Sequence, residues 1–404
     1  MRAVALSLLA LILPVAAWAQ DAAPLTLTAA IDRALAANPA VLAAQRRRAI
    51  GAAGVAVAGE RLNPEGRVEF DRDTPRQAYT LAVPLELGGK RARRLEVAEA
   101  GVRTADAEIA QVVAETRNAV RRAFVDRAVA EARLALLDDL QTITTRVRDA
   151  AQQRFDAGDA PRLEVLQAQL AFAQAQNEVT GARGLTVAAR ARFNALLGMP
   201  SDAATILAPV DPGDAITLDV AMARARAASV ELAVFDRRLE EQRARIALAR
   251  SLQTPDITPE GSFTHGFGDD ADFQNGWKAA FAISLPMFTT HKAGVTLEQA
   301  TLTQLMAERA AAEARIAGEV AAATAIVDSQ RQLYIRYRDE IIPQALQVET
   351  MADDAYRLGQ TGIAAYLLAL QATRDVRLRS LQALADLQAA LSDLEQAMGA
   401  PLQP

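Results

Sequence analysis

Residues 91–113 read RARRLEVAEAGVRTADAEIAQVV, and this stretch decides the fold. Its apolar side chains recur at steps of three and four residues, at Leu95, Ala98, Val102, Ala105, Ile109 and Val112. That spacing is typical of a helix with a coiled-coil seam. No proline and only one glycine, Gly101, interrupt residues 91–156. A single helix of about 100 Å is therefore expected, at about 1.5 Å per residue.

The residues that follow predict where this helix ends and a second one begins. Gly158 and Pro161 have the order expected of a helix stop. A second periodic segment runs on to Gly198 and Pro200. We therefore expect long helices over about 91–157 and 160–198.

The composition of the 404-residue chain is consistent with closely packed helices. It contains 91 alanines, only 18 aromatic residues and no cysteine. Alanine favours helices and lets their backbones approach closely. The net charge of −5 gives no basic excess for nucleic-acid binding. The lack of cysteine excludes disulfides, thiolate metal sites and lipidation on a cysteine.

Residues 1–19 have the pattern of a signal peptide. Arg2 precedes a short apolar run, and Ala17-Trp18-Ala19 forms a small-x-small cleavage site. No later stretch has 18 consecutive apolar residues, so we expect an exported protein in which any membrane-spanning part is built of strands.

The chain contains two copies of one structural plan. Pro64 and Pro255 are 191 residues apart, Lys90 and Lys292 are 202 apart, and Gly158 and Gly359 are 201 apart. Ordered agreement of this kind indicates duplication. We assign the first repeat to 20–210 and the second to 211–404, with the second pair of long helices over about 293–358 and 362–398.

Each repeat also has a segment with strand periodicity. Trp277, Phe281 and Leu285 lie on one alternating face, opposite small or polar residues. The two predicted hairpins, about 65–87 and 257–288, hold eight of the 18 aromatics, as expected of strands that face lipid. Four strands cannot close a barrel without unpaired edges, so several copies would have to pool their hairpins.

These residues resemble the TolC family of outer-membrane efflux channels over essentially the whole mature chain. The resemblance is carried by Leu27-Thr28 through Asn38-Pro39, by residues 84–91 (PLELGGKR), by residues 283–288 (ISLPMF), and by the turn at 154–159 with its copy at 356–359. The run ELGGKR at 86–91 looks most like the CzcC branch, the outer-membrane components of heavy-metal exporters driven by resistance-nodulation-division (RND) pumps.

The resemblance implies a mainly α fold with a β-barrel part. Three protomers would each give four strands to a shared 12-stranded barrel in the outer membrane, and their coiled-coil helices would form a tunnel in the periplasm. The implied partners are two further copies, a periplasmic adaptor (membrane fusion protein), an inner-membrane RND pump and outer-membrane lipid. The implied function is a passive exit duct for heavy-metal cations of the Co/Zn/Cd or Cu/Ag class.

The resemblance also implies roles at the helical tips. The residues expected to dock the adaptor are Gly158, Leu163, Leu166, Gly359, Ala364 and Leu367. Some family members carry acidic residues six and nine positions after the second tip glycine, where rings of charge select cations. Ala365 and Leu368 stand there in this chain, whereas the first repeat has Glu164 and Gln167. Glu164 is thus the candidate for a charged aperture, and a solvated surface glutamate is the alternative.

Residues around the hairpins are candidates for the membrane interface. Lys90, Arg91, Arg93 and Arg94 follow the first hairpin, where long cations could reach lipid headgroups; a solvated helical turn is the alternative. Phe273, Trp277 and Phe288 fit an aromatic girdle; the alternative is packing within a soluble hairpin.

Three other functions stay open. The channel could carry drugs or other organic molecules, or the chain could be a periplasmic coiled-coil adaptor or scaffold. A periplasmic hydrolase is the third, but His265 and His291 lack a neighbouring carboxylate or serine motif, so we expect no catalytic residue. The sequence predicts no cofactor site and no metal site.

Overall fold

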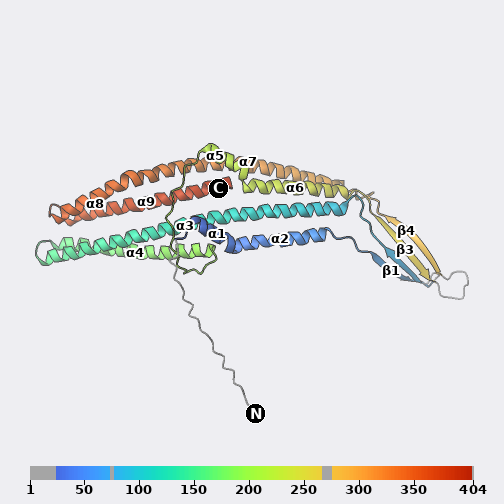
Figure 1. Cartoon of the computed structure of the whole chain (residues 1–404), viewed down its shortest axis with the longest axis horizontal. Helices are drawn as coiled ribbons and strands as arrows, with labels where there is room; N and C mark the ends of the chain where they lie inside the picture. Colours follow the sequence, from blue (N-terminus) through green and yellow to red (C-terminus); the bar gives the residue numbers. More distant parts are fainter. Residues whose placement is uncertain (1–23, 73–76, 266–274, 403–404) are drawn as a thin grey trace, which may run out of the picture.

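The computed structural model describes residues 24–72, 77–265 and 275–402. The expected signal peptide and Phe273 lie outside these residues. Figure 1 shows a long rod of helices with a sheet at one end and helical hairpin tips at the other. In the described part of the chain, no helix combines the length and apolarity needed to cross a membrane.

The two repeats have the same order of elements. The first contains α1 (Leu27–Ala37), α2 (Pro39–Ala58), β1 (Glu65–Phe70), β2 (Gln77–Ala82), α3 (Lys90–Asp156) and α4 (Arg162–Leu196). The second contains α5 (Leu218–Ala228), α6 (Val230–Ser251), β3 (Ile257–His265), β4 (Asn275–Ile283), α7 (Lys292–Arg336), a π-helical turn (Tyr337–Ile341), α8 (Ile342–Arg357) and α9 (Ile363–Met398).

The sheet repeats the duplication at the level of strand register. Its four strands are antiparallel in the order β1-β2-β3-β4. Gly66 pairs with Leu81 in the first hairpin, and Ile257 pairs with Ile283 in the second. These partners are shifted by 191 and 202 residues, the same shifts that relate the two repeats in the sequence.

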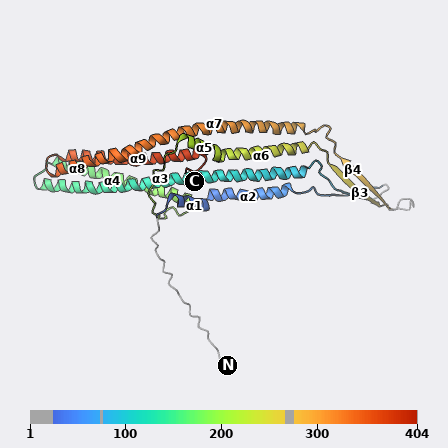
Figure 2. The ribbon, with the colours of Figure 1, turned by 45° about the horizontal axis from the view of Figure 1, so that its top comes forward.

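The helices next to the sheet follow the order of the strands. Seen after a turn of 45°, α2, α3, α6 and α7 lie side by side in Figure 2, and α3 and α6 occupy the middle. β2 and β3 likewise occupy the middle of the sheet. The outer elements of a single chain are therefore β1 with α2 on one side and β4 with α7 on the other.

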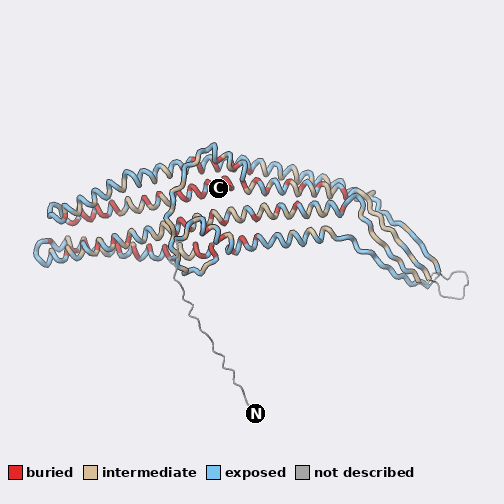
Figure 3. The backbone as a smooth tube through the Cα atoms, in the orientation of Figure 1, coloured by how far each residue is buried: buried red, intermediate tan, exposed pale blue. Residues whose placement is uncertain are grey.

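Small side chains allow the helices to pack closely midway along the rod. Ala30 and Ala34 of α1 and their repeat counterparts Ala221 and Ala225 of α5 are almost completely buried. The first pair packs with Phe193 and its neighbours, the second with side chains of α7 and α9. Figure 3 shows that buried residues follow the helices, whereas the sheet is largely exposed or half-buried.

The second long helix of each repeat starts after a tight turn. Gly158 and Gly359 have φ of 84° and 68°, a left-handed conformation that glycine adopts without strain. The amide of Gly158 donates to the carbonyl of Phe155 at 2.9 Å, as at a helix end.

The helix expected over about 293–358 is interrupted by the π-helical turn. The amide of Ile342 donates to the carbonyl of Tyr337, five residues earlier. Pro343 follows immediately, and a proline has no N–H and its ring clashes with the carbonyl four residues before it. The widened turn accommodates that proline, so α7 and α8 are separate segments of one continuous path.

Candidate functional site

The residues that the sequence singles out gather at the two ends of the rod. The interface candidates lie where the sheet meets the helices, and the docking and aperture candidates lie at the tips of the hairpins α3–α4 and α8–α9 (Figure 1). We call the first region the junction and the second the tip.

Lys90 at the junction is buried and paired within the chain. Its Nζ lies 2.7 Å from Oδ2 of Asp256, the residue just before β3. The other carboxylate oxygen of Asp256 accepts the backbone N–H of Leu87 at 2.9 Å. Burial acts to raise the pKa of Asp256, but the bonds from Lys90 and Leu87 outweigh it and leave the pKa below its usual range. The Lys90 ammonium is thus held by the second repeat rather than free to reach headgroups.

The other three cations of the junction differ in how far they are engaged. Arg94 donates through two nitrogens to both carboxylate oxygens of Glu86, and this pairing lowers the pKa of Glu86. Arg91 donates to the carbonyl of Gly59 at 2.6 Å. Arg93 is exposed and pairs only with Glu96 of its own helix.

The junction of the second repeat is apolar and exposed. Phe288 is 99% exposed and Met287 is 73% exposed. Trp277 on β4 is 85% exposed. His291 precedes α7 with a positive φ of 54°, at the place where the first repeat has Gly89. The aromatic candidates in the described residues therefore face outward.

Five of the six docking candidates are exposed at the tip. Leu163 is 62% exposed and Leu166 is 51% exposed, and Gly158, Gly359 and Ala364 are also exposed. Leu367 differs because it is 8% exposed and packs in the apolar cluster that joins the two hairpins. It contributes to the packing of the tip and not to its exposed surface.

That cluster contains two stacked tyrosines. The rings of Tyr356 on α8 and Tyr366 on α9 are parallel within 7° at 5.6 Å. The guanidinium of Arg154 on α3 lies 5.4 Å from the centre of the Tyr356 ring. Burial, together with the charges of Asp353 and Glu349, raises the pKa of Tyr366 to about 12. Cation–π contact and stacking thus connect the first hairpin to the second.

The four aperture candidates have different surroundings. Glu164 is half-buried, and one of its carboxylate oxygens lies 3.8 Å from Arg154. Gln167 is half-buried, whereas Ala365 and Leu368 are exposed. In a single chain, Glu164 therefore faces the connection between the hairpins.

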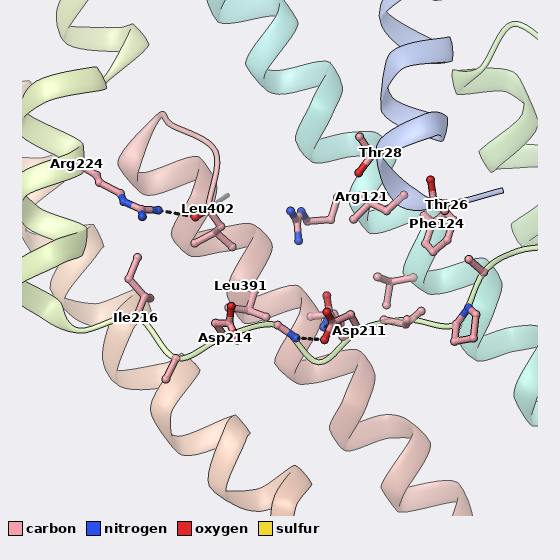
Figure 4. A pocket seen from close by; sticks show the side chains of 18 of the residues that line it. Thr26, Thr28, Arg121, Phe124, Asp211, Asp214, Ile216, Arg224, Leu391 and Leu402 are labelled. Atoms are coloured by element: carbon pink, nitrogen blue, oxygen red, sulfur yellow. Dashed lines mark hydrogen bonds between the residues drawn. The ribbon is translucent and has the colours of Figure 1, made fainter. Parts of the chain in front are cut away.

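A hollow of about 570 Å³ lies midway along the rod, between the inter-repeat linker, α1, α3 and α9 (Figure 4). Its charged side chains are already engaged. Arg224 donates to the carbonyl of Leu402, Asp211 accepts the amide of Gly213, and Arg121 lies 2.8 Å from a carboxylate oxygen of Glu395. These contacts join the two repeats to each other.

The described residues contain no group of three or more His, Asp or Glu side chains that could hold a metal ion. Sequence reasoning missed Asp256 and Glu86 as partners of the junction cations. A signal for Asp256 did exist, because an acidic residue follows the matched proline in both repeats, at Glu65 and Asp256.

Comparison with known proteins agrees with the fold. Residues 30–199 match the model of the family described as outer membrane efflux protein. The structure of the outer-membrane channel OprN superposes with a TM-score of 0.74 at 20% identity, covering 94% of this chain and 91% of that one. The expected resemblance and the TolC-like fold are confirmed. The matched family and structure are channels and not enzymes.

Two relatives are named for metal resistance. The cobalt-zinc-cadmium resistance protein CzcC of Cupriavidus metallidurans is 29% identical over 243 residues, which are 59% of this chain and 58% of the relative. The nickel-cobalt-cadmium resistance protein NccC of Alcaligenes xylosoxydans xylosoxydans is 25% identical over 259 residues, 60% and 56% of the two chains. The match spans less than two thirds of either relative.

Proposed function

We propose that this chain, which resembles the outer membrane efflux proteins over residues 30–199 and has their fold, is the outer-membrane channel of a tripartite efflux system. The observation that carries the proposal is the four-stranded sheet at the end of the long helical rod. Both edge strands, β1 and β4, lack a neighbour in the described chain. In lipid, unpaired edges cost several kcal/mol per backbone group, so the sheet needs further copies to complete it.

In this proposal three copies form the channel, with the sheets in the outer membrane and the helices in the periplasm. The tip docks a periplasmic adaptor through the exposed Leu163 and Leu166, and the adaptor connects it to an inner-membrane RND pump. Glu164 lines the aperture. The exposed Trp277 and Phe288 contact lipid, as does Arg93. Energy comes from the pump, and the channel is a passive duct.

The proposed cargo is heavy-metal cations. Similarity to CzcC and NccC, both named for divalent-metal resistance, supports this choice. A duct needs no tight site, because ions must leave it as readily as they enter. The described residues, with no metal-holding cluster, are compatible with such a duct.

Deletion of the gene tests the proposal. We expect lower tolerance to cobalt, zinc, cadmium or nickel, or to copper or silver, with restoration by the plasmid-borne gene. Unchanged tolerance to all these metals together with new sensitivity to organic drugs would replace the cargo but keep the channel. Recovery of the mature protein from the periplasm, and not from the outer membrane, on a sucrose gradient would overturn the channel itself.

A further inference from the structure

The two repeats meet in the middle of the sheet through a specific set of contacts. β2 and β3 pair in register from Gln77↔His265 to Ala82↔Glu260, and a further bridge joins Leu85 and Ile257. Beside that bridge, Lys90 pairs with Asp256 at 2.7 Å and is buried. One residue after a strand pair and one residue before α3 are thus locked together across repeats.

The counterparts of these residues lie at the two outer edges of the same chain. Lys292 is 202 residues after Lys90, and Glu65 is 191 residues before Asp256. Both are exposed, and within the described residues neither side chain makes an ion pair. β1 and β4 are three strand spacings apart, about 14 Å, so the two cannot meet within one sheet. Each has the charge that the other would need.

The helices beside these edges repeat the pattern with apolar side chains. In the middle of the rod, Thr104 of α3 donates to Glu241 of α6 at 3.0 Å. The repeat counterparts of these two residues are Met306 on α7 and Ile50 on α2. Met306 is 55% exposed and Ile50 is 72% exposed in the single chain. An apolar pair would replace the polar contact, and both side chains now lie open to solvent.

We propose that β4 and α7 of one copy pack against β1 and α2 of a second copy in the register of the internal β2–β3 contact. The bridge Leu85–Ile257 then has Met287–Gly66 as its counterpart, and Arg67 lies opposite Pro286. Lys292 pairs with Glu65 of the next copy, and Met306 packs on Ile50 of the next copy. The contact rests on the proposed channel, since it specifies how its copies join.

Cysteine pairs test the register, because the chain contains no cysteine. Arg67 and Pro286 correspond to a position where paired residues do not exchange hydrogen bonds, so their Cβ atoms lie close together. We expect the double variant Arg67→Cys, Pro286→Cys to form covalent dimers and trimers on mild oxidation in outer membranes. The control Glu69→Cys, Pro286→Cys is two residues out of register and should stay largely uncross-linked.

Charge reversal tests the ion pair separately. Glu65→Lys or Lys292→Glu alone should lose the assembled form at a detergent concentration that leaves the unmodified protein assembled. The double reversal Glu65→Lys, Lys292→Glu should recover it. Two single variants that behave like the unmodified protein, or a double variant no better than either, would overturn the pair.

The outcomes separate this contact from the proposed channel. Assembled copies that cross-link in the control but not in the test pair would overturn the register while leaving the channel. Cross-linking within one chain, seen as a monomer band with altered mobility, would overturn it as well. A protein that light scattering shows to be monomeric in detergent would contradict both. Covalent trimers in a strain whose metal and drug tolerance ignores the gene would support the contact and contradict the efflux function.

Discussion

At the scale of single residues, Lys90 depends on a carboxylate 166 positions away in the chain. Asp256→Asn leaves a buried ammonium and the Leu87 N–H without their partner. We expect a loss of about 1–2 kcal/mol, at the low end for such groups because Asp256 is one third exposed. Thermal unfolding in detergent, followed by circular dichroism, measures it. Asp139→Asn, an exposed change on α3, is the control.

The same pair predicts a pH dependence. The folded-state pKa of Asp256 is lowered, so its stabilisation is complete above the unfolded pKa of about 3.9 and is lost as the pH falls through the folded value. The difference in unfolding midpoint between the native chain and Asp256→Asn should therefore be constant near neutral pH and shrink below about pH 4. A difference that grows on acidification would show that another group is responsible.

Residues also mark the limit of what the sequence could predict. Lys90 was expected to face lipid headgroups because its local sequence has four cations within five residues. Local sequence carries no information about Asp256, which reaches Lys90 only because the two hairpins pair through β2 and β3. Leu367 was expected at the docking surface for the same reason, because its burial depends on Tyr356 and Tyr366.

At the scale of elements, periodicity predicted the long helices and the hairpins well. The 191- and 202-residue shifts even match the strand registers, because register follows from which residues share a face. The π-helical turn at Tyr337–Ile341 was not predicted. Its cause, Pro343, is visible in the sequence, but a proline can end or bend a helix as well as widen it.

The tip cluster gives a prediction for two helical hairpins together. Tyr356 is buried between α3, α4 and α9, so Tyr356→Ala removes packing on both hairpins. We expect a local loss of about 3 kcal/mol, equal to about a 100-fold faster amide exchange in residues 147–168 and 356–367. Tyr356→Phe retains the ring and should leave exchange nearly unchanged. Faster exchange in 356–367 alone would mean that the ring does not connect the hairpins.

At the scale of the whole molecule, the low aromatic content reflects an uneven division of side chains. Alanines such as Ala30 and Ala221 fill the closest contacts between helices, whereas Trp277, Phe281 and Phe288 lie exposed near the sheet. An exposed ring costs apolar area in water, and a lipid surface or a second copy would remove that cost. The single chain is thus incomplete at its sheet and along α2 and α7.

The tip is the part of the molecule that the proposed function assigns to the adaptor. Leu163 and Leu166 are exposed on the first turns of α4, so Leu163→Asp, Leu166→Asp places charge there without opening the core. We expect metal tolerance to fall to that of the deletion strain, with normal amounts of assembled protein in the outer membrane. Leu185→Asp, on the same helix and 58% exposed, is the matched control and should retain tolerance. Full tolerance in the double variant would remove the adaptor from this surface, whereas loss in both variants would point to assembly instead of docking.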